Sequence, residues 1–306
     1  MKIGVIGAGA IGLLIASYLD DCGHRVTVYT KRAEQAERIS GVGIRRSVWQ
    51  MTTTHDVRAV PFSADAVEAE EIVFIALKQY QLAEHREEVE KLTRKVGALV
   101  FLQNGMSHLS IVEALSECKV YLGIVEHGAL KTSEHEVIHT GAGCLKVGIY
   151  RQERKRDREL FTQLTEVGFS TMIQSDWEMI MKQKLVVNAV INPLTALYRV
   201  NNGQLMTNTS MKTNMYRLYK EAISVLGIEQ IDLWEQVCAV CEQTSTNRSS
   251  MLRDIELNRK TEVDAITGYL VKQADDRGLT VPYTRFVYDS IKGLESKQKE
   301  ARGEER

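Results

Sequence analysis

The segment from Lys184 to Pro193 places three polar side chains four residues apart in an otherwise apolar run. On a helix, a step of four residues is little more than one full turn, so Lys184, Asn188 and Asn192 form one stripe. A polar group buried without a partner costs about 1–3 kcal/mol, and an unpaired ammonium costs more. The stripe therefore indicates the wall of a site that binds something polar, with a satisfied polar seam between helices or a solvent face as the alternatives.

The chain opens with a β-rich run and the turn Gly7-Ala8-Gly9-Ala10-Ile11-Gly12, which a helical pattern and a second strand follow. This order is typical of a dinucleotide-binding unit. Gly7 permits a tight turn, Gly9 lets the backbone approach a pyrophosphate, and Gly12 lets the helix pack closely on the strand. The start of the helix then offers N–H groups and a positive dipole end to the phosphates.

The end of the second strand indicates which dinucleotide is bound. An NAD site usually has an acidic residue there to hold the ribose 2′-hydroxyl. Here the strand runs into Thr30, Lys31 and Arg32, and no acid occurs before Glu34. Lys31 or Arg32 can pair with a 2′-phosphate, whereas a carboxylate would repel it. The sequence favours NADPH, although two exposed basic residues at the start of a helix would have the same pattern.

Two further buried strands are expected over residues 71–76 and 98–102, and they lead into Lys78 and Asn104. Ligands of open α/β sheets bind beyond the carboxyl ends of the strands, so both side chains are candidates to touch cofactor or substrate. A surface lysine and a turn-forming asparagine are the alternatives. Short β segments between residues 120 and 149 are expected to complete the sheet, partly in antiparallel pairing.

The strand signals fade in the second half of the chain. Asp176 is a plausible N-cap for a long helix, and helical periodicity continues to about residue 293. The charge-dense segment 295–306 is expected to fray. We therefore predict an α/β protein with a Rossmann-type dinucleotide-binding domain over residues 1–168, followed by an all-helical domain over residues 169–306.

Composition limits the function classes. A chain of 306 residues with 44% hydrophobic content can form two ordinary domains. Its net charge of -1 lacks the excess of positive charge that binding to nucleic acid or to an acidic membrane would favour. Apolar runs are too short for a membrane span, and the first strand leaves no room for a signal peptide. The five scattered cysteines suit a reduced, cytoplasmic protein, in which Cys238 and Cys241 are two helical thiols rather than a zinc or redox pair. No metal site is expected.

At this point the sequence resembles a known family, the ketopantoate reductases (2-dehydropantoate 2-reductases), over nearly its whole length. The matching segments are the glycine turn, Asn104-Gly-Met106, Lys184-Leu-Val-Val-Asn188-Ala-Val-Ile-Asn192-Pro-Leu-Thr195, Asn202-Gly203, Ser249-Ser-Met-Leu-Arg-Asp254 and Thr261-Glu262-Val-Asp264. The resemblance implies a Rossmann domain plus a helical domain. It also implies NADPH-dependent reduction of ketopantoate to pantoate, on the route to pantothenate and coenzyme A.

The resemblance also implies roles for single residues. Lys184 would be the general acid, and the substrate would be held by Asn188, Asn192, Asn202 and Ser250. Asn104 would meet both cofactor and substrate, and Glu262 would meet the cofactor. The family's 2′-phosphate-binding arginine falls on Lys31, a departure for which Arg32 could substitute. Thr261 and Asp264 are expected to form a capping box, which leaves Glu262 unassigned by local structure.

The mechanism implied by the resemblance is hydride transfer to the 2-keto carbon, with Lys184 stabilising the growing alkoxide and delivering the proton. Two other interpretations remain open: a reductase of another small 2-keto acid in the same fold, and a non-catalytic NADPH-binding sensor. The sensor has no need of a proton donor. The helical domain could also pair two copies of the chain into a homodimer.

Overall fold

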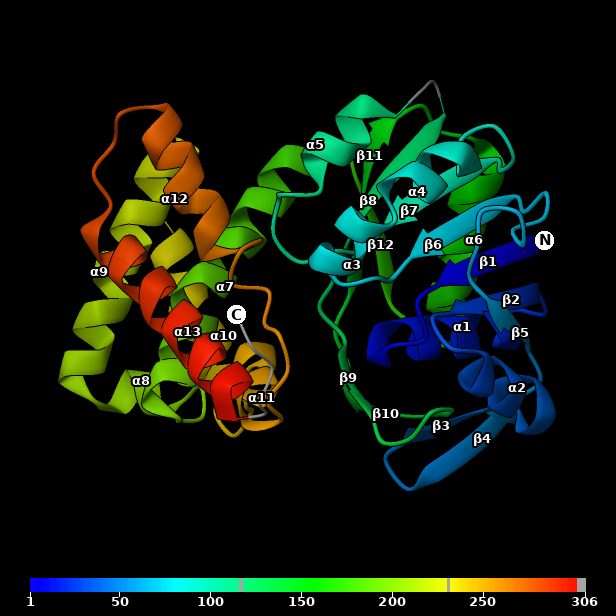
Figure 1. The fold of residues 1–306 in the computed structure, drawn as a ribbon, viewed down its shortest axis with the longest axis horizontal. Coiled ribbons are helices and arrows are strands. Elements are labelled where there is room, and N and C mark those ends of the chain that lie inside the picture. Colours follow the sequence, from blue (N-terminus) through cyan, green and yellow to red (C-terminus); the bar gives the residue numbers. More distant parts are fainter. Residues whose placement is uncertain (116–117, 230–231, 302–306) are drawn as a thin grey trace. The chain divides into compact units, whose positions relative to one another are not determined.

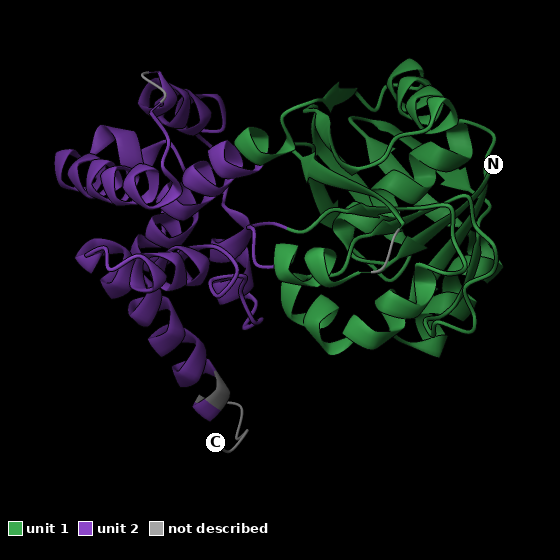
Figure 2. Ribbon diagram, turned by 90° about the horizontal axis from the view of Figure 1, so that it is seen from above, with its two compact units in different colours: residues 1–103, 108–180 green, residues 104–107, 181–306 purple. Residues whose placement is uncertain are grey.

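The structure, a computed structural model, describes residues 1–115, 118–229 and 232–301. The chain divides into two compact units (Figure 2). Unit 1 comprises residues 1–103 and 108–180, and unit 2 comprises residues 104–107 and those from 181 onward.

Unit 1 contains a twisted sheet of mixed direction, which is eight-stranded in the described part of the chain (Figure 1). Its strands are β1 (Lys2–Ile6), β2 (Arg25–Thr30), β5 (Arg58–Pro61), β6 (Ile72–Ile75), β7 (Ala98–Phe101), β8 (Lys119–Val125), β11 (Leu145–Arg151) and β12 (Thr171–Gln174). Their order is β12-β11-β8-β7-β6-β1-β2-β5. All neighbours pair in parallel except β11 and β8, which are antiparallel. The apolar strands β6 and β7 are fully buried, as expected for strands covered on both faces.

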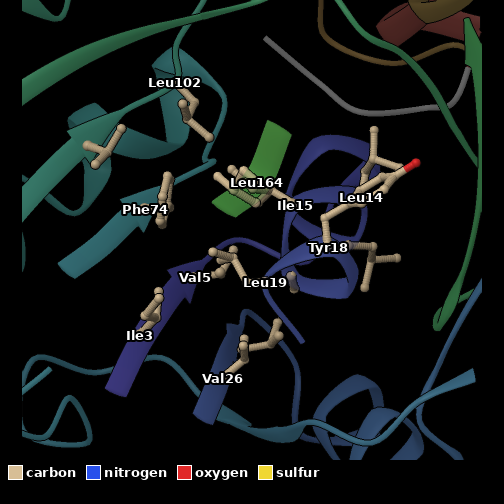
Figure 3. Close-up of a cluster of buried hydrophobic side chains, with 14 of the residues drawn as sticks. Ile3, Val5, Leu14, Ile15, Tyr18, Leu19, Val26, Phe74, Leu102 and Leu164 are labelled. Atoms are coloured by element: carbon tan, nitrogen blue, oxygen red, sulfur yellow. The ribbon is translucent and has the colours of Figure 1, made fainter. Parts of the chain in front are cut away.

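Helices connect these strands. They are α1 (Ala10–Asp21), α2 (Ala33–Val42), α3 (Gln79–Glu84), α4 (Arg86–Leu92), α5 (Leu109–Ala114) and α6 (Lys155–Glu166). Figure 3 shows the core on one face of the sheet, where Leu14 of α1 and Leu164 of α6 lie with Val5 and Phe74. Every residue from 12 to 19 in α1 is buried. A helix that is buried on all sides needs cover on more than one side, and a second sheet provides it.

This second sheet has the order β4-β3-β10-β9, with β3 (Ile44–Val48), β4 (Met51–His55), β9 (Gly128–Lys131) and β10 (Glu136–Gly141). It corrects one expectation. Of the segments between residues 120 and 149, β8 and β11 do complete the main sheet and form its antiparallel pair. Of the segments between them, β9 pairs with β10, β10 pairs with β3, and β3 pairs with β4. All four strands of the small sheet contact α1.

A chain of buried polar groups lies between α1 and the small sheet. The Tyr18 hydroxyl is hydrogen-bonded to Nδ1 of His139 at 2.8 Å, and Nε2 of His139 lies 3.1 Å from Nδ1 of His127. Nε2 of His127 lies 3.1 Å from the carbonyl of Ser170, which only accepts, so this nitrogen carries the proton. Nδ1 of His127 then accepts from the N–H of Gly143. His127 is neutral in this arrangement, and burial lowers the pKa of both imidazoles.

Unit 1 extends further along the chain than residue 168, where the sequence suggested a boundary. The residues just after this boundary contain β12, and β12 pairs in parallel with β11, Thr171 opposite Leu145. The sheet therefore keeps residues 169–180 in the first unit.

Unit 2 is helical, as expected. Its helices are α7 (Trp177–Tyr198), whose first turn is counted with unit 1, α8 (Gln204–Thr207), α9 (Thr209–Leu226), α10 (Leu233–Gln243), α11 (Ser250–Glu256), α12 (Thr267–Asp276) and α13 (Pro282–Ala301). The Asp176 carboxylate accepts from the N–H of Met179 at 2.9 Å, which confirms it as the cap of α7. The expected fraying from Glu295 is wrong as far as Ala301, because α13 continues to that residue, and residues 302–306 lie outside the described part. No helix in the described residues is long and apolar enough to cross a membrane.

Candidate active site

The glycine turn between β1 and α1 has the geometry that its spacing predicts. Gly7 has φ +104°, a value that L side chains rarely adopt, and a Cβ there would lie 2.9 Å from the carbonyl oxygen of Ala76. A Cβ on Gly12 would lie 1.8 Å from the carbonyl oxygen of Gly7, so helix and turn approach too closely for any side chain. A Cβ on Gly9 would meet nothing within 4 Å. The middle glycine therefore faces open space while the other two are packed.

The open space lies at the N-terminus of α1. Gly9 is the N-cap residue, and no side chain caps the helix there. The first backbone N–H groups of a helix have no partner within it, so those of Ala10 and Ile11 are available to an anion, and the helix dipole favours negative charge. This arrangement fits a pyrophosphate.

Two basic residues follow β2, as the sequence indicated. Lys31 is exposed, and within the described residues no partner of its ammonium is recorded. Arg32 is the N-cap residue of α2, and its Nη2 lies 2.6 Å from Oε1 of Glu134 in the turn between β9 and β10. Sequence reasoning missed Glu134, because nothing local connects it to the glycine turn.

Lys78 lies in the same unit, just beyond the end of β6. The N–H of Ala76 donates to the carbonyl of Ile6 at 2.8 Å, so the chain after β6 runs beside the end of β1 and the glycine turn. The backbone N–H of Lys78 donates to the side chain of Gln81 at the start of α3. The carboxyl ends of β1 and β6 thus bring Lys78 and the glycine turn to one edge of the sheet.

The polar stripe that the sequence predicted lies on α7 in unit 2. Asn188 and Asn192 are 7% and 9% exposed, and Lys184 is half-buried at the end of the stripe nearer the helix start. The residues between them, such as Leu185 and Val190, are buried in the apolar core of the helix bundle. The stripe thus offers one cation and two neutral amides, a set that can orient a polar ligand and donate a proton to it.

Asn104 comes shortly after the end of β7, and the preceding residue, Gln103, donates to the carbonyl of Leu77 at 3.0 Å. Residues 104–107 are grouped with unit 2, where Nδ2 of Asn104 donates to Oε2 of Glu262 at 3.0 Å. The next residue, Gly105, has φ +78°, and a Cβ there would lie 2.0 Å from the carbonyl oxygen of Ala265. This close approach of two backbones joins two candidate ligand-binding residues that are far apart in sequence.

The two serines at the start of α11 differ in burial and in hydrogen bonding. Ser249 is buried and is the N-cap, accepting from the N–H of Leu252 at 3.1 Å and from the Thr195 hydroxyl at 2.7 Å. Ser250 is the first residue of the helix and is exposed. Its position suits contact with a ligand, whereas the hydroxyl of Ser249 is committed to the fold.

Asn202 is buried at 8% exposure, and its Nδ2 donates to the Thr244 hydroxyl at 2.8 Å. In the described part of the chain its Oδ1 has no partner. Buried side-chain oxygens are usually hydrogen-bonded, so this oxygen is a candidate acceptor for a ligand hydroxyl.

The expected capping box is confirmed at Thr261 and wrong at Asp264. The Thr261 hydroxyl accepts from the N–H of Val263 at 3.2 Å, as a cap does, and the Thr261 N–H and hydroxyl both donate to the Glu295 carboxylate at 2.7 Å. Asp264 accepts from the Tyr288 hydroxyl and pairs with Lys292 at 3.1 Å instead of reaching back. A long-range partner on α13 therefore takes the backbone N–H of Thr261 that Asp264 was expected to bind.

The two cysteines with CxxC spacing lie one turn apart on α10, as two helical thiols. Both are free, and burial raises the pKa of each, that of Cys241 to about 12. Among the described residues, no group of three or more His, Cys, Asp or Glu is arranged to hold a metal ion.

Comparison with known proteins agrees with this organisation. The model of the family "Ketopantoate reductase PanE/ApbA" matches residues 3–152, and that of its C-terminal domain matches residues 176–295. The chain is 39% identical over 298 residues to the 2-dehydropantoate 2-reductase of Bacillus subtilis (strain 168), covering 96% of this chain and 98% of that protein.

Solved structures agree as well. The crystal structure of the probable 2-dehydropantoate 2-reductase of Bacillus subtilis superposes with a TM-score of 0.85 over 96% of this chain and all (100%) of that one. A D-mandelate dehydrogenase in complex with NADH and anilino(oxo)acetate gives a TM-score of 0.88 at 22% identity, over 98% of this chain and 100% of that chain, a likeness of fold alone. The expected fold class, a Rossmann-type domain followed by a helical domain, is confirmed. The chain belongs to the ketopantoate reductase family.

Proposed function

We propose that the protein reduces 2-dehydropantoate (ketopantoate) to pantoate with NADPH, in the biosynthesis of pantothenate and coenzyme A. The observation that carries the proposal is the stripe of Lys184, Asn188 and Asn192 on α7, in a member of this family. The stripe supplies a cation and two amides in an apolar helix, which suits a small polar substrate whose carbonyl oxygen becomes an alkoxide.

The glycine turn supports the cofactor part of the proposal. Its open space at Gly9 and the uncapped start of α1 fit the pyrophosphate, and Lys31 and Arg32 would hold the 2′-phosphate. Lys78, Asn104 and Glu262 complete the proposed cofactor contacts. When bound, NADPH supplies the hydride for the 2-keto carbon. The absence of an acid at the end of β2 favours NADPH over NADH.

Lys184 is the proposed proton donor. Its ammonium would hydrogen-bond the keto oxygen, stabilise the negative charge that grows there and deliver the proton to that oxygen. Asn188, Asn192 and Asn202 would orient the substrate without competing for the proton, because amides do not ionise. Ser250 and the first N–H groups of α11 would suit the substrate carboxylate, with Asn104 reaching substrate as well as cofactor.

The proposal is tested by the loss of NADPH absorbance with a panel of 2-keto acids. The panel contains ketopantoate, a smaller aliphatic keto acid and an aromatic one. Ketopantoate should give the highest kcat/KM. An aromatic keto acid as the preferred substrate would favour the second interpretation, a reductase of another 2-keto acid. Binding of NADPH with no reduction of any member would favour the sensor.

Lys184→Ala provides the residue-level test. Turnover should fall by a factor of about 10²–10⁴, the usual loss for a positioned general acid, while NADPH affinity stays close to that of the unmodified protein. Lys182→Ala is the matched control, because it removes the same charge from the same helix on a different face. Near-normal turnover of Lys184→Ala at saturating ketopantoate would rule out the assignment.

The pairing of two copies into a homodimer, the cytoplasmic location and the absence of nucleic-acid and membrane partners stay predictions. Light scattering on the purified protein tests the first of these.

A further inference from the structure

The turn between β9 and β10 is linked to the glycine turn by hydrogen bonds. Nζ of Lys131 donates to the carbonyl of Ala8 at 3.2 Å, and Nε2 of Gln35, on α2, donates to the same carbonyl at 3.0 Å. Gln35 is 6% exposed, and its Nε2 also donates to the backbone carbonyl of Glu134 at 2.8 Å. The glycine turn, the first turn of α2 and this hairpin turn therefore hold one another in place, although the hairpin lies about a hundred residues later in the chain.

The side chain of Glu134 forms ion pairs with two basic side chains near the glycine turn. Its Oε1 lies 2.6 Å from Nη2 of Arg32, and its Oε2 lies 3.3 Å from Nζ of Lys131. The hydrogen bond from Arg32 holds the pKa of Glu134 below its usual range, so the carboxylate is ionised at neutral pH. The side chains of Arg32 and Glu134 are 57% and 44% exposed, so a ligand can reach the pair.

We propose that Glu134 weakens the preference for NADPH, because its carboxylate competes with the cofactor's 2′-phosphate for the guanidinium of Arg32. This inference rests on the proposed function, in which the basic residues after β2 hold that phosphate. Carboxylate and phosphate engage the same planar donors of an arginine, so binding of one excludes or distorts the other. Two anions on one guanidinium also repel each other. Lys31 has no such competitor among the described residues and remains available to the phosphate.

The size of the effect follows from the exposure of the pair. Exposed ion pairs of this kind change an equilibrium by a factor of about two to five. Removal of the charge with Glu134→Gln should therefore tighten NADPH binding by about two- to fivefold and leave NADH binding unchanged. Because the charges are exposed, the gain should shrink as the salt concentration rises past the physiological range.

The experiment measures the affinity of the full-length protein for NADPH and for NADH by the change in nicotinamide fluorescence on binding. Glu136→Gln is the matched control, because Glu136 lies in the same hairpin and pairs with Arg45 at 2.6 Å, not with Arg32. NADPH should bind more tightly to Glu134→Gln and unchanged to Glu136→Gln. Unchanged or weaker NADPH binding by Glu134→Gln would overturn the inference, and weaker binding would mean that the carboxylate holds Arg32 ready for the phosphate.

Arg32→Gln closes the comparison. If Glu134 acts through Arg32, Glu134→Gln should give a smaller gain in the Arg32→Gln background than in the unmodified one. An equal gain in both backgrounds would overturn the stated route. The proposed NADPH preference is judged separately, on the unmodified protein: equal affinity for NADPH and NADH contradicts the preference, whereas a strong preference unaffected by Glu134→Gln contradicts only the role of Glu134.

Discussion

Alanine at Gly9 should impair cofactor binding and alanine at Gly12 should impair stability, although both add one methyl group to the same turn. Gly9 has φ -81° and ψ -171°, values open to any residue, and its Cβ would meet nothing within 4 Å. The loss of chain entropy in the unfolded state favours Gly9→Ala by about 0.4–1 kcal/mol, and alanine is a poorer N-cap than glycine by a similar amount. The free energy of unfolding should therefore change by no more than about 0.5 kcal/mol.

Gly9→Ala should instead weaken binding of the cofactor. The methyl group of Gly9→Ala would fill the space that we propose for the pyrophosphate, and hydrogen bonds to a charged group contribute about 1.5–3 kcal/mol each. The loss of one such bond weakens NADPH binding by about ten- to a hundredfold.

Gly12→Ala places its Cβ 1.8 Å from the carbonyl oxygen of Gly7, where contacts under 3.0 Å essentially never occur, so helix and turn must separate. We expect it to destabilise the fold by about 1–3 kcal/mol.

Thermal unfolding with and without NADPH separates the two effects. Gly9→Ala should melt with the unmodified protein when no cofactor is added, and it should gain little on addition of NADPH. Gly12→Ala should melt several degrees lower in both conditions. The reasoning is refuted if Gly9→Ala is as unstable as Gly12→Ala, or if it binds NADPH with undiminished affinity.

Three further predictions follow from the site and the core. Asn188→Ala should raise KM for ketopantoate more than it lowers kcat, because the amide orients the substrate; a fall in kcat alone, in steady-state kinetics, would contradict this role. Arg32→Glu should weaken NADPH binding and spare NADH binding in the fluorescence titration, and equal losses for both cofactors would count against a phosphate contact. Burial lowers the pKa values of six histidines from the ordinary 6.5, His127 and His139 among them, so the unfolded chain binds protons more readily than the folded one below that value. The stability in urea should be flat above about pH 7 and fall as the pH drops from about 6.5 toward the lowered values, and a midpoint that stays constant over that range would show that these rings do not contribute.

The parts of the fold that the sequence predicts well are those encoded over short distances. The glycine turn and the stripe on α7 depend on spacings of only two to four residues between neighbouring members. Both have the predicted geometry. The sequence does not predict the small sheet. Its strand β4, Met51–His55, contains no apolar alternation, and the sheet depends on the pairing of β3 with β10, which are far apart in the chain. No local pattern in the sequence encodes such a pairing.

The same distinction applies to the candidate site. Asn104 comes shortly after the end of β7, so the sequence predicts its place near the sheet edge, but its partner Glu262 lies 158 residues away in the chain and has no local signal. Glu134 has no local motif, and only the fold of the hairpin brings it to Arg32. Residue types are readable from spacing, whereas partners across long stretches of chain require the folded structure.

The short segment 104–107 has a consequence for the order in which the protein is made. The chain passes into unit 2 for these four residues, returns to unit 1 and leaves it again at residue 181. During synthesis from the N-terminus, the main sheet has all of its strands once Gln174 has emerged, but Ala265, on which Gly105 packs, is made much later. The nascent chain can therefore complete its nucleotide-binding half while Asn104 still lacks its partner Glu262. This contact forms only after Glu262 has left the ribosome, so the proposed site is assembled later than the main sheet.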